Sequence, residues 1–205
     1  IVYKSKKYKK SECNTIYIGG GTPSLLSSTQ LKKISDFIFT CFNISSNYEF
    51  TVELNPDDVS ESLLKSLEYA KVNRLSLGLQ SMSDDVLKFI HRRANRSQNF
   101  NAIKLISRKW KGNVSFDFIC GLPYEKKESF LNNLEEVLAY NPDHISLYSL
   151  CVDEETVLGN KICNKIIEYD YDFSDELWLC GKDIIEKNGY FQYEVSNFSI
   201  KGFEC

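Results

Sequence analysis

Three consecutive glycines follow a short apolar run near the start of the chain and form a loop that could hold a ligand. The apolar run is 15–18, and residues 19–24 read Gly-Gly-Gly-Thr-Pro-Ser. Because glycine has no side chain, the backbone N–H groups of Gly20 and Gly21 can approach a small polar ligand closely, and Thr22 adds a hydroxyl group. Three glycines can equally form a plain turn, so the loop alone leaves both interpretations open.

Polar residues recur where later apolar runs end. Glu53 lies in the run 48–54, Gln80 follows the run 73–79, and Asp117 lies in the run 113–119. Each of them alone fits a rim residue or a helix cap. Together with the glycine loop, they favour one shared site for a small molecule.

A basic stretch after the third run offers a further candidate. His91 is followed by Arg92, Arg93 and Arg96, at the expected end of a helix. One of these arginines could bind a carboxylate with two parallel hydrogen bonds, whereas the other interpretation is a solvated helix end. His144, the second of two histidines, is expected to lie at a strand edge. Two unrelated histidines make a Ser-His-Asp triad or a histidine-based metal site improbable.

Other motifs with known chemistry are not found in the sequence. The glycine triplet lacks the G-x-G-x-x-G spacing of dinucleotide-binding folds, and no Gly-Lys-Ser/Thr follows it as in a phosphate-binding loop. Seven scattered cysteines argue against a disulfide framework, and no two of them have the C-x-x-C spacing of a zinc or iron–sulfur site. Cys41, Cys120 and Cys180 lie in apolar stretches and are expected to be buried.

The composition is that of a globular protein. Of the 205 residues, 42% are hydrophobic and 26% charged, and the net charge is −3, which does not favour nucleic acid as a partner. Five lysines among the first ten residues (Lys4, Lys6, Lys7, Lys9 and Lys10) are interpreted as a solvated terminus. No apolar run is long enough to span a bilayer, so we expect a cytoplasmic protein without a membrane span.

Strand-like and helix-like segments alternate along the chain. The expected strands are 14–18, 48–54, 73–79, 113–119, 143–150 and 190–195, and the expected helices are 28–41, 60–70, 83–91, 97–109, 125–140 and 173–188. Such alternation predicts right-handed βαβ units and a parallel sheet in one α/β domain over 1–205, either an open sheet or part of a (β/α) barrel. Ligands of such folds bind at the carboxyl ends of the strands, where the candidate residues lie.

Five motifs occur in an order that resembles a known family. They are Gly-Gly-Gly-Thr-Pro-Ser, Val-Glu-Leu-Asn-Pro (52–56), Arg-Leu-Ser-Leu-Gly-Leu-Gln-Ser (74–81), Asp-Phe-Ile-Cys-Gly-Leu-Pro (117–123) and His-Ile-Ser-Leu-Tyr (144–148). This is similar to the radical S-adenosylmethionine (SAM) family of oxygen-independent coproporphyrinogen III oxidases and HemW-type haem chaperones. The resemblance extends from about residue 14 to residue 205, and Glu-Leu-Asn-Pro, Gly-Leu-Gln-Ser and the ending Tyr-Glu-Val-Ser-Asn-Phe (193–198) are closer to the HemW branch.

The resemblance implies a partial TIM-like barrel of the radical SAM type and a set of SAM-binding residues. Gly20, Gly21 and Thr22 would hold the methionine end, and Glu53 would bind the ribose hydroxyls. Gln80, Arg92, Asp117 and Cys151 would complete the pocket, and Glu53, Gln80 and Asp117 should point into a common cavity.

One departure from the family bears on the [4Fe–4S] cluster. Radical members carry C-x-x-x-C-x-x-C upstream of the glycine motif, whereas one cysteine, Cys13, precedes it here. The first barrel strand, the cluster loop and the C-terminal domain are therefore expected to be absent from this chain. We expect an internal or truncated piece without metal ligands and without radical catalysis of its own.

Two classes of function follow from the resemblance. One is a haem-binding chaperone that passes haem to an acceptor protein, which the local motifs favour. The other is an oxidase that cleaves SAM reductively and attacks the propionates of a porphyrinogen.

Overall fold

The computed structural model describes residues 2–8 and 11–205. Within them the strands are β1 (Glu12–Ile18), β2 (Asn43–Leu54), β3 (Arg74–Gln80), β4 (Asn113–Cys120), β5 (His144–Ser149), β6 (Phe191–Gln192) and β7 (Asn197–Ser199). The helices are α1 (Val2–Tyr8), α2 (Ser28–Cys41), α3 (Glu61–Tyr69), α4 (Asp84–Phe89), α5 (Arg96–Lys109), α6 (Lys127–Leu138), α7 (Val157–Cys163) and α8 (Tyr171–Lys187), with short 3-10 turns η1 (Pro23–Leu25) and η2 (Pro56–Asp58).

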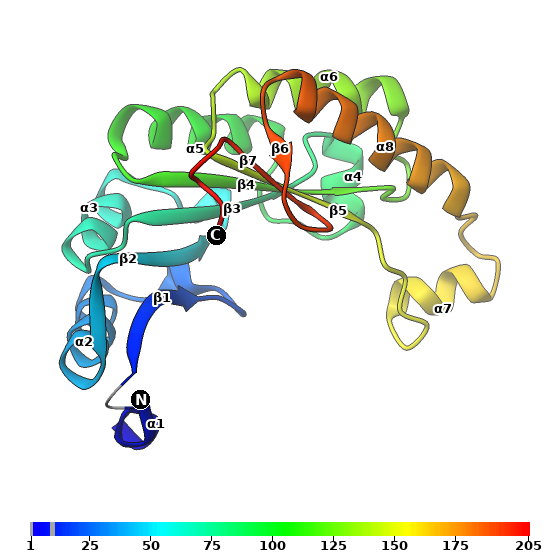
Figure 1. Ribbon diagram of the computed structural model, residues 1–205. Coiled ribbons are helices and arrows are strands. Elements are labelled where there is room, and N and C mark those ends of the chain that lie inside the picture. Colours follow the sequence, from blue (N-terminus) through cyan, green and yellow to red (C-terminus); the bar gives the residue numbers. More distant parts are fainter. Residues whose placement is uncertain (1, 9–10) are drawn as a thin grey trace.

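The strands form one curled sheet in the order β1-β2-β3-β4-β5-β7-β6 (Figure 1). β1 to β5 are parallel and follow sequence order, so the predicted partial barrel is confirmed for these five strands. The expected strand 190–195 was wrong in extent, because only residues 191–192 form a strand, β6. A short loop joins β6 to β7, so these two strands pair antiparallel, and β7 also runs antiparallel to β5.

The two faces of the sheet differ in polarity. Alternate residues of β2 to β5, among them Val52, Leu77, Phe118 and Leu147, are fully buried in the hydrophobic core. Helices α2, α3, α5, α6 and α8 lie along this outer side of the sheet (Figure 1). The strand residues that alternate with these buried ones face the inside of the curled sheet and are mostly polar. The inner face of the sheet is therefore not filled by an apolar core.

Local signals in the sequence place most helix ends. Ser27 and Asn95 cap α2 and α5 in capping boxes completed by Gln30 and Gln98, and Ser60 caps α3. α7 was not anticipated. This helix has only seven residues, is capped by Thr156 and stands away from the sheet (Figure 1), so no apolar periodicity marks it in the sequence.

Three further expectations can be compared with the structure. Cys120 is buried, but Cys41 and Cys180 are only half-buried, because each lies on a helix near the edge of its packed face. Lys4 and Lys6 are exposed, whereas Lys9, Lys10 and the side chain of Lys7 lie outside the described residues. Over the ranges that the structure describes, none of the helices combines the length and apolarity needed to cross a bilayer.

Candidate functional site

A cavity of about 430 Å³ lies on the inner side of the curled sheet. Its lining comes from the loop after β1, from β2 to β5, from the loop after α4 and from the C-terminal segment. The lining residues are Tyr17, Gly21, Pro23, Glu53, Leu54, Asn55, Arg74, Ser76, Gly78, Gln80, Arg92, Ser115, Asp117, His144, Ser146, Tyr148, Asn197 and Cys205. Most of these residues are polar, which is typical of a site for a hydrophilic ligand.

The mouth of the cavity is organised around the Glu53 carboxylate. Its Oε1 accepts a hydrogen bond from the Tyr17 hydroxyl at 2.6 Å, and its Oε2 accepts one from the backbone N–H of Gly20 at 2.8 Å. A Cβ atom on Gly19 would lie 2.6 Å from Glu53 Oε1, so this close approach requires glycine. Burial and the nearby Glu53 carboxylate raise the pKa of Tyr17, which therefore stays a neutral donor.

The glycine loop and the end of β3 lie on either side of Glu53. Gly20 and Gly21 have φ angles of 77° and 66°, and the space beside their Cα atoms is open. Arg92 Nη2 donates to the Gly78 carbonyl at 2.6 Å and to Asn55 Oδ1 at 3.1 Å. Burial lowers the pKa of Arg92, but its ordinary pKa is so high that the side chain keeps its charge.

Serine hydroxyls hold the Asp117 carboxylate in the floor of the cavity. Ser76 Oγ donates to Asp117 Oδ2 at 2.5 Å and Ser115 Oγ donates to Asp117 Oδ1 at 3.1 Å. Burial raises the pKa of Asp117, whereas hydrogen bonds from Ser76, Ser146 and Ser115 and the charge of Arg74 oppose this rise. The carboxylate thus lies within a hydroxyl network rather than in an ion pair.

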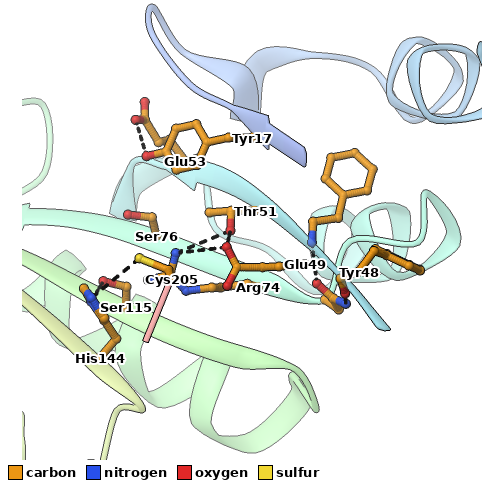
Figure 2. A network of polar contacts seen from close by, with 12 residues as sticks. Tyr17, Tyr48, Glu49, Thr51, Glu53, Arg74, Ser76, Ser115, His144 and Cys205 are labelled. Carbon is orange, nitrogen blue, oxygen red and sulfur yellow. Dashed lines mark hydrogen bonds and ion pairs between the residues drawn. The ribbon is translucent and has the colours of Figure 1, made fainter. Parts of the chain in front are cut away.

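His144 continues this network toward the C-terminal segment. Its Nδ1 lies 2.9 Å from Ser115 Oγ and its Nε2 lies 2.8 Å from the Tyr193 hydroxyl, which is itself 3.0 Å from Cys205 Sγ. Figure 2 shows His144, Ser115 and Cys205 on one side of the network and Tyr17 with Glu53 on the other. His144 begins β5, as expected of a residue at the edge of a strand, but it is only 1% exposed, and Tyr193 and Cys205 contact its ring.

The structure brings most of the predicted residues together. Gly21, Glu53, Gln80, Arg92 and Asp117 line the cavity, which confirms that Glu53, Gln80 and Asp117 point into a common space. Gly20 contacts Glu53 through its backbone. Three predicted residues are not among those that line it: Gly20, Thr22, which precedes η1, and Cys151, which is exposed beyond the end of β5.

The sequence interpretation gave no role to the residues in the floor. These are Arg74, Ser76, Ser115, His144 and Ser146. A signal for them was available, because each pair at positions 74/76, 115/117 and 144/146 is polar with an apolar residue between, and alternate residues of a strand share one face.

The residues present fit SAM but not an iron–sulfur cluster. A carboxylate fixed beside a glycine loop can accept hydrogen bonds from a diol, and Gln80 and Arg92 add polar groups around the same space. Within residues 2–8 and 11–205, no three side chains of His, Cys, Asp or Glu gather in a way that could hold a metal ion.

Comparisons with known proteins agree with this geometry. The model of the Radical SAM superfamily matches residues 1–137. The "Heme chaperone HemW" of Lactococcus lactis is 34% identical over all of this chain and 54% of its own length, and that of Bacillus subtilis is 36% identical over 97% of this chain and 53% of its own length. The chain thus spans about half the length of the curated relatives it matches.

A solved structure supports the fold. Coproporphyrinogen III oxidase (HemN) from Escherichia coli, described as a radical SAM enzyme, superposes with a TM-score of 0.85 at 21% sequence identity, covering 98% of this chain and 46% of that chain. At this identity the similarity concerns the fold alone.

Proposed function

We propose, since this chain belongs to the radical SAM superfamily, that its cavity binds SAM and that the protein acts as a haem-binding chaperone. The position of Glu53 is the observation that carries SAM binding. Its carboxylate is fixed by Tyr17 and Gly20 at the carboxyl ends of parallel strands, where α/β folds bind ligands. A carboxylate held in this way can accept hydrogen bonds from both hydroxyl groups of a ribose.

Other residues complete the proposed SAM site. The backbone of Gly20 and Gly21, with Thr22 beside it, would hold the amino-acid end, and Gln80, Arg92 and Asp117 would surround the rest of the ligand. Cys151 would contribute only if the loop after β5 moved inward. When bound, SAM would supply radical chemistry only if an electron donor reduced it.

The experiment is calorimetric titration of SAM into the wild type and into Glu53→Ala. Hydrogen bonds to a charged group contribute about 1.5–3 kcal/mol, so Glu53→Ala should weaken SAM binding roughly tenfold or more. Glu61→Ala is the matched control, because Glu61 is an exposed carboxylate at the start of α3 paired with Lys109. Equal SAM affinity in the wild type and Glu53→Ala would remove this role from Glu53.

The haem proposal rests on the relatives named as haem chaperones. We propose that the protein binds haem and passes it to an acceptor protein, and that it works in the cytoplasm, where its seven free cysteines would stay reduced. The alternative is a coproporphyrinogen III oxidase, the activity in the name of the E. coli protein with the similar fold.

One experiment separates the chaperone from the oxidase. The protein, with whatever flanking sequence its gene encodes, is incubated anaerobically with SAM, a reductant and coproporphyrinogen III, and the products are analysed. We expect saturable haem binding in a parallel titration and no decarboxylated product. Many turnovers to protoporphyrinogen would establish the oxidase instead.

A further inference from the structure

The inner face of the sheet stays polar from the level of Glu53 toward the amino ends of the strands. Glu53 pairs with Ser76 on β3, and Thr51 pairs with Arg74, so Arg74 lies one inward-facing row lower, about 7 Å along the strand. Closed (β/α) barrels usually fill this level with branched apolar side chains. Here it is occupied by a guanidinium, hydroxyls and an imidazole that line the same cavity as Glu53.

Arg74 has longer polar contacts than the other polar groups of the floor. Asp117, Ser115 and His144 are joined by hydrogen bonds of 2.9 and 3.1 Å. Arg74, in contrast, has two contacts among the described residues, both long. Its Nη1 lies 3.4 Å from Thr51 Oγ1 and 3.6 Å from Glu49 Oε1, as Figure 2 shows.

The guanidinium of Arg74 has hydrogen-bond donors that the protein leaves unused. The side chain is only 5% exposed, and its guanidinium carries five N–H donors. Its two contacts both involve Nη1, and the other two guanidinium nitrogens are not among the fully buried unpartnered atoms of the described residues, so they are open to the cavity. Because Arg74 lines the cavity, the acceptor that it lacks can come from a ligand.

We infer that Arg74 binds a carboxylate of a second ligand, which lies below SAM in the same cavity. The planar guanidinium matches a carboxylate with two parallel hydrogen bonds. Ser76 and Ser115 offer hydroxyls beside it, and His144 offers an uncharged ring. Of the residues proposed for SAM, only Asp117 lies in the floor, so Arg74 and the hydroxyls beside it are left to another molecule.

The ligand class is an organic carboxylate, and the identity tested below rests on the proposed haem-binding function. The propionate arms of haem are short, flexible chains that end in carboxylates. β1 and β6 at the two ends of the described sheet are not paired with each other, so the sheet is open. The inference places a propionate at Arg74 and the porphyrin ring at this opening.

The test compares the dissociation constants of haem and haem dimethyl ester, in which both carboxylates are blocked. The protein, with the flanking sequence its gene encodes, is titrated with each compound and followed by absorption. The wild type should bind haem about tenfold more tightly than the ester, and Arg74→Gln should abolish this preference. Arg74→Lys keeps the charge but loses the planar fork, so it should keep part of the preference.

Two control variants separate recognition from structure. Arg108→Gln removes an exposed arginine near the end of α5 and should leave the preference unchanged. Glu49→Gln removes the acidic neighbour of Arg74 and should preserve the preference. If Arg74 only paired with Glu49, Arg74→Gln and Glu49→Gln would both lower the melting temperature and both keep the preference. The far-ultraviolet circular dichroism spectrum of every variant reports on correct folding, and SAM affinity is measured separately.

Each outcome points to a different conclusion. Equal wild-type affinity for haem and its ester, or an unchanged preference in Arg74→Gln, overturns the inference and leaves haem binding intact. A loss of SAM affinity in Arg74→Gln without a change in preference assigns Arg74 to SAM and also overturns it. No saturable haem binding by the wild type refutes the haem proposal and this inference together.

Discussion

His144 is enclosed by groups that disfavour its charged form. The side chain is 1% exposed, and its ring nitrogens contact Ser115 and Tyr193. Burial, together with the positive charge of Arg74, lowers the pKa of His144 from 6.5 to about 3. The floor of the cavity therefore presents a neutral imidazole over the physiological pH range.

This lowered pKa predicts a pH dependence of stability. Between about pH 6.5 and pH 3 the unfolded chain binds a proton at His144 that the folded protein does not, so the free energy of unfolding should fall as the pH falls. The slope attributable to His144 approaches about 1.4 kcal/mol per pH unit. Denaturant unfolding of the wild type and of His144→Gln between pH 6.5 and pH 3 measures this slope. Equal slopes in the two proteins would contradict the lowered pKa of His144.

At the scale of elements, β3 connects the packed core to the site. Leu75, Leu77 and Leu79 face the helices, whereas Arg74, Ser76 and Gly78 face the cavity. The register with β4 shifts between Gly78 and Gln80, and Gln80 has a φ of 64°. This irregularity ends the strand and lets the Gln80 side chain lie over Gly78 beside Arg92.

Gly78→Ala should damage the site without unfolding the protein. The new Cβ would lie 2.9 Å from Gln80 Nε2 and 3.3 Å from Arg92 Nη2, which are ends of flexible side chains and can move. Moving Arg92 away from the Gly78 carbonyl disturbs a hydrogen bond worth about 1.5–3 kcal/mol, so SAM affinity should fall about tenfold while the melting temperature changes little. Calorimetry and thermal unfolding measure the two quantities.

Gly181→Ala on α8 is the matched comparison and should show the opposite pattern. Its Cβ would lie 2.9 Å from Leu147 Cδ2 and 3.2 Å from a Phe130 ring carbon, both in the core. Overpacking a core costs about 1–3 kcal/mol, more than the helix propensity of alanine returns, so stability should fall while SAM affinity stays unchanged. If Gly78→Ala lost stability instead of affinity, β3 would not shape the site as described.

At the scale of the whole molecule, the seven cysteines are spread over separate parts of the fold. Cys13 lies on β1, Cys41 ends α2, Cys120 ends β4, Cys180 lies on α8, and Cys151, Cys163 and Cys205 are exposed. A [4Fe–4S] cluster needs several thiolates converging on one short region. The described residues offer no such convergence.

The 205-residue chain should therefore fail to hold a cluster by itself. After anaerobic reconstitution with iron and sulfide, followed by desalting, we expect far less than one cluster for each chain and no stable charge-transfer absorption. Iron and sulfide analysis of the desalted sample provides the measurement. A stoichiometric cluster that survives desalting would mean that thiolates from different elements can converge.

The sequence by itself determined the alternation of strands and helices, the cap at Ser60, and the gathering of Glu53, Gln80 and Asp117 at one site. These features follow from local rules, because periodicity, capping and the position of residues at strand ends act over a few neighbouring residues. Only the tertiary structure decided that β7 runs antiparallel to β5, that Tyr193 and Cys205 contact the ring of His144, and that Arg74 is buried with two long contacts. Burial and partnership depend on segments far apart in the chain, as when β7 reaches β5, and no short pattern encodes them.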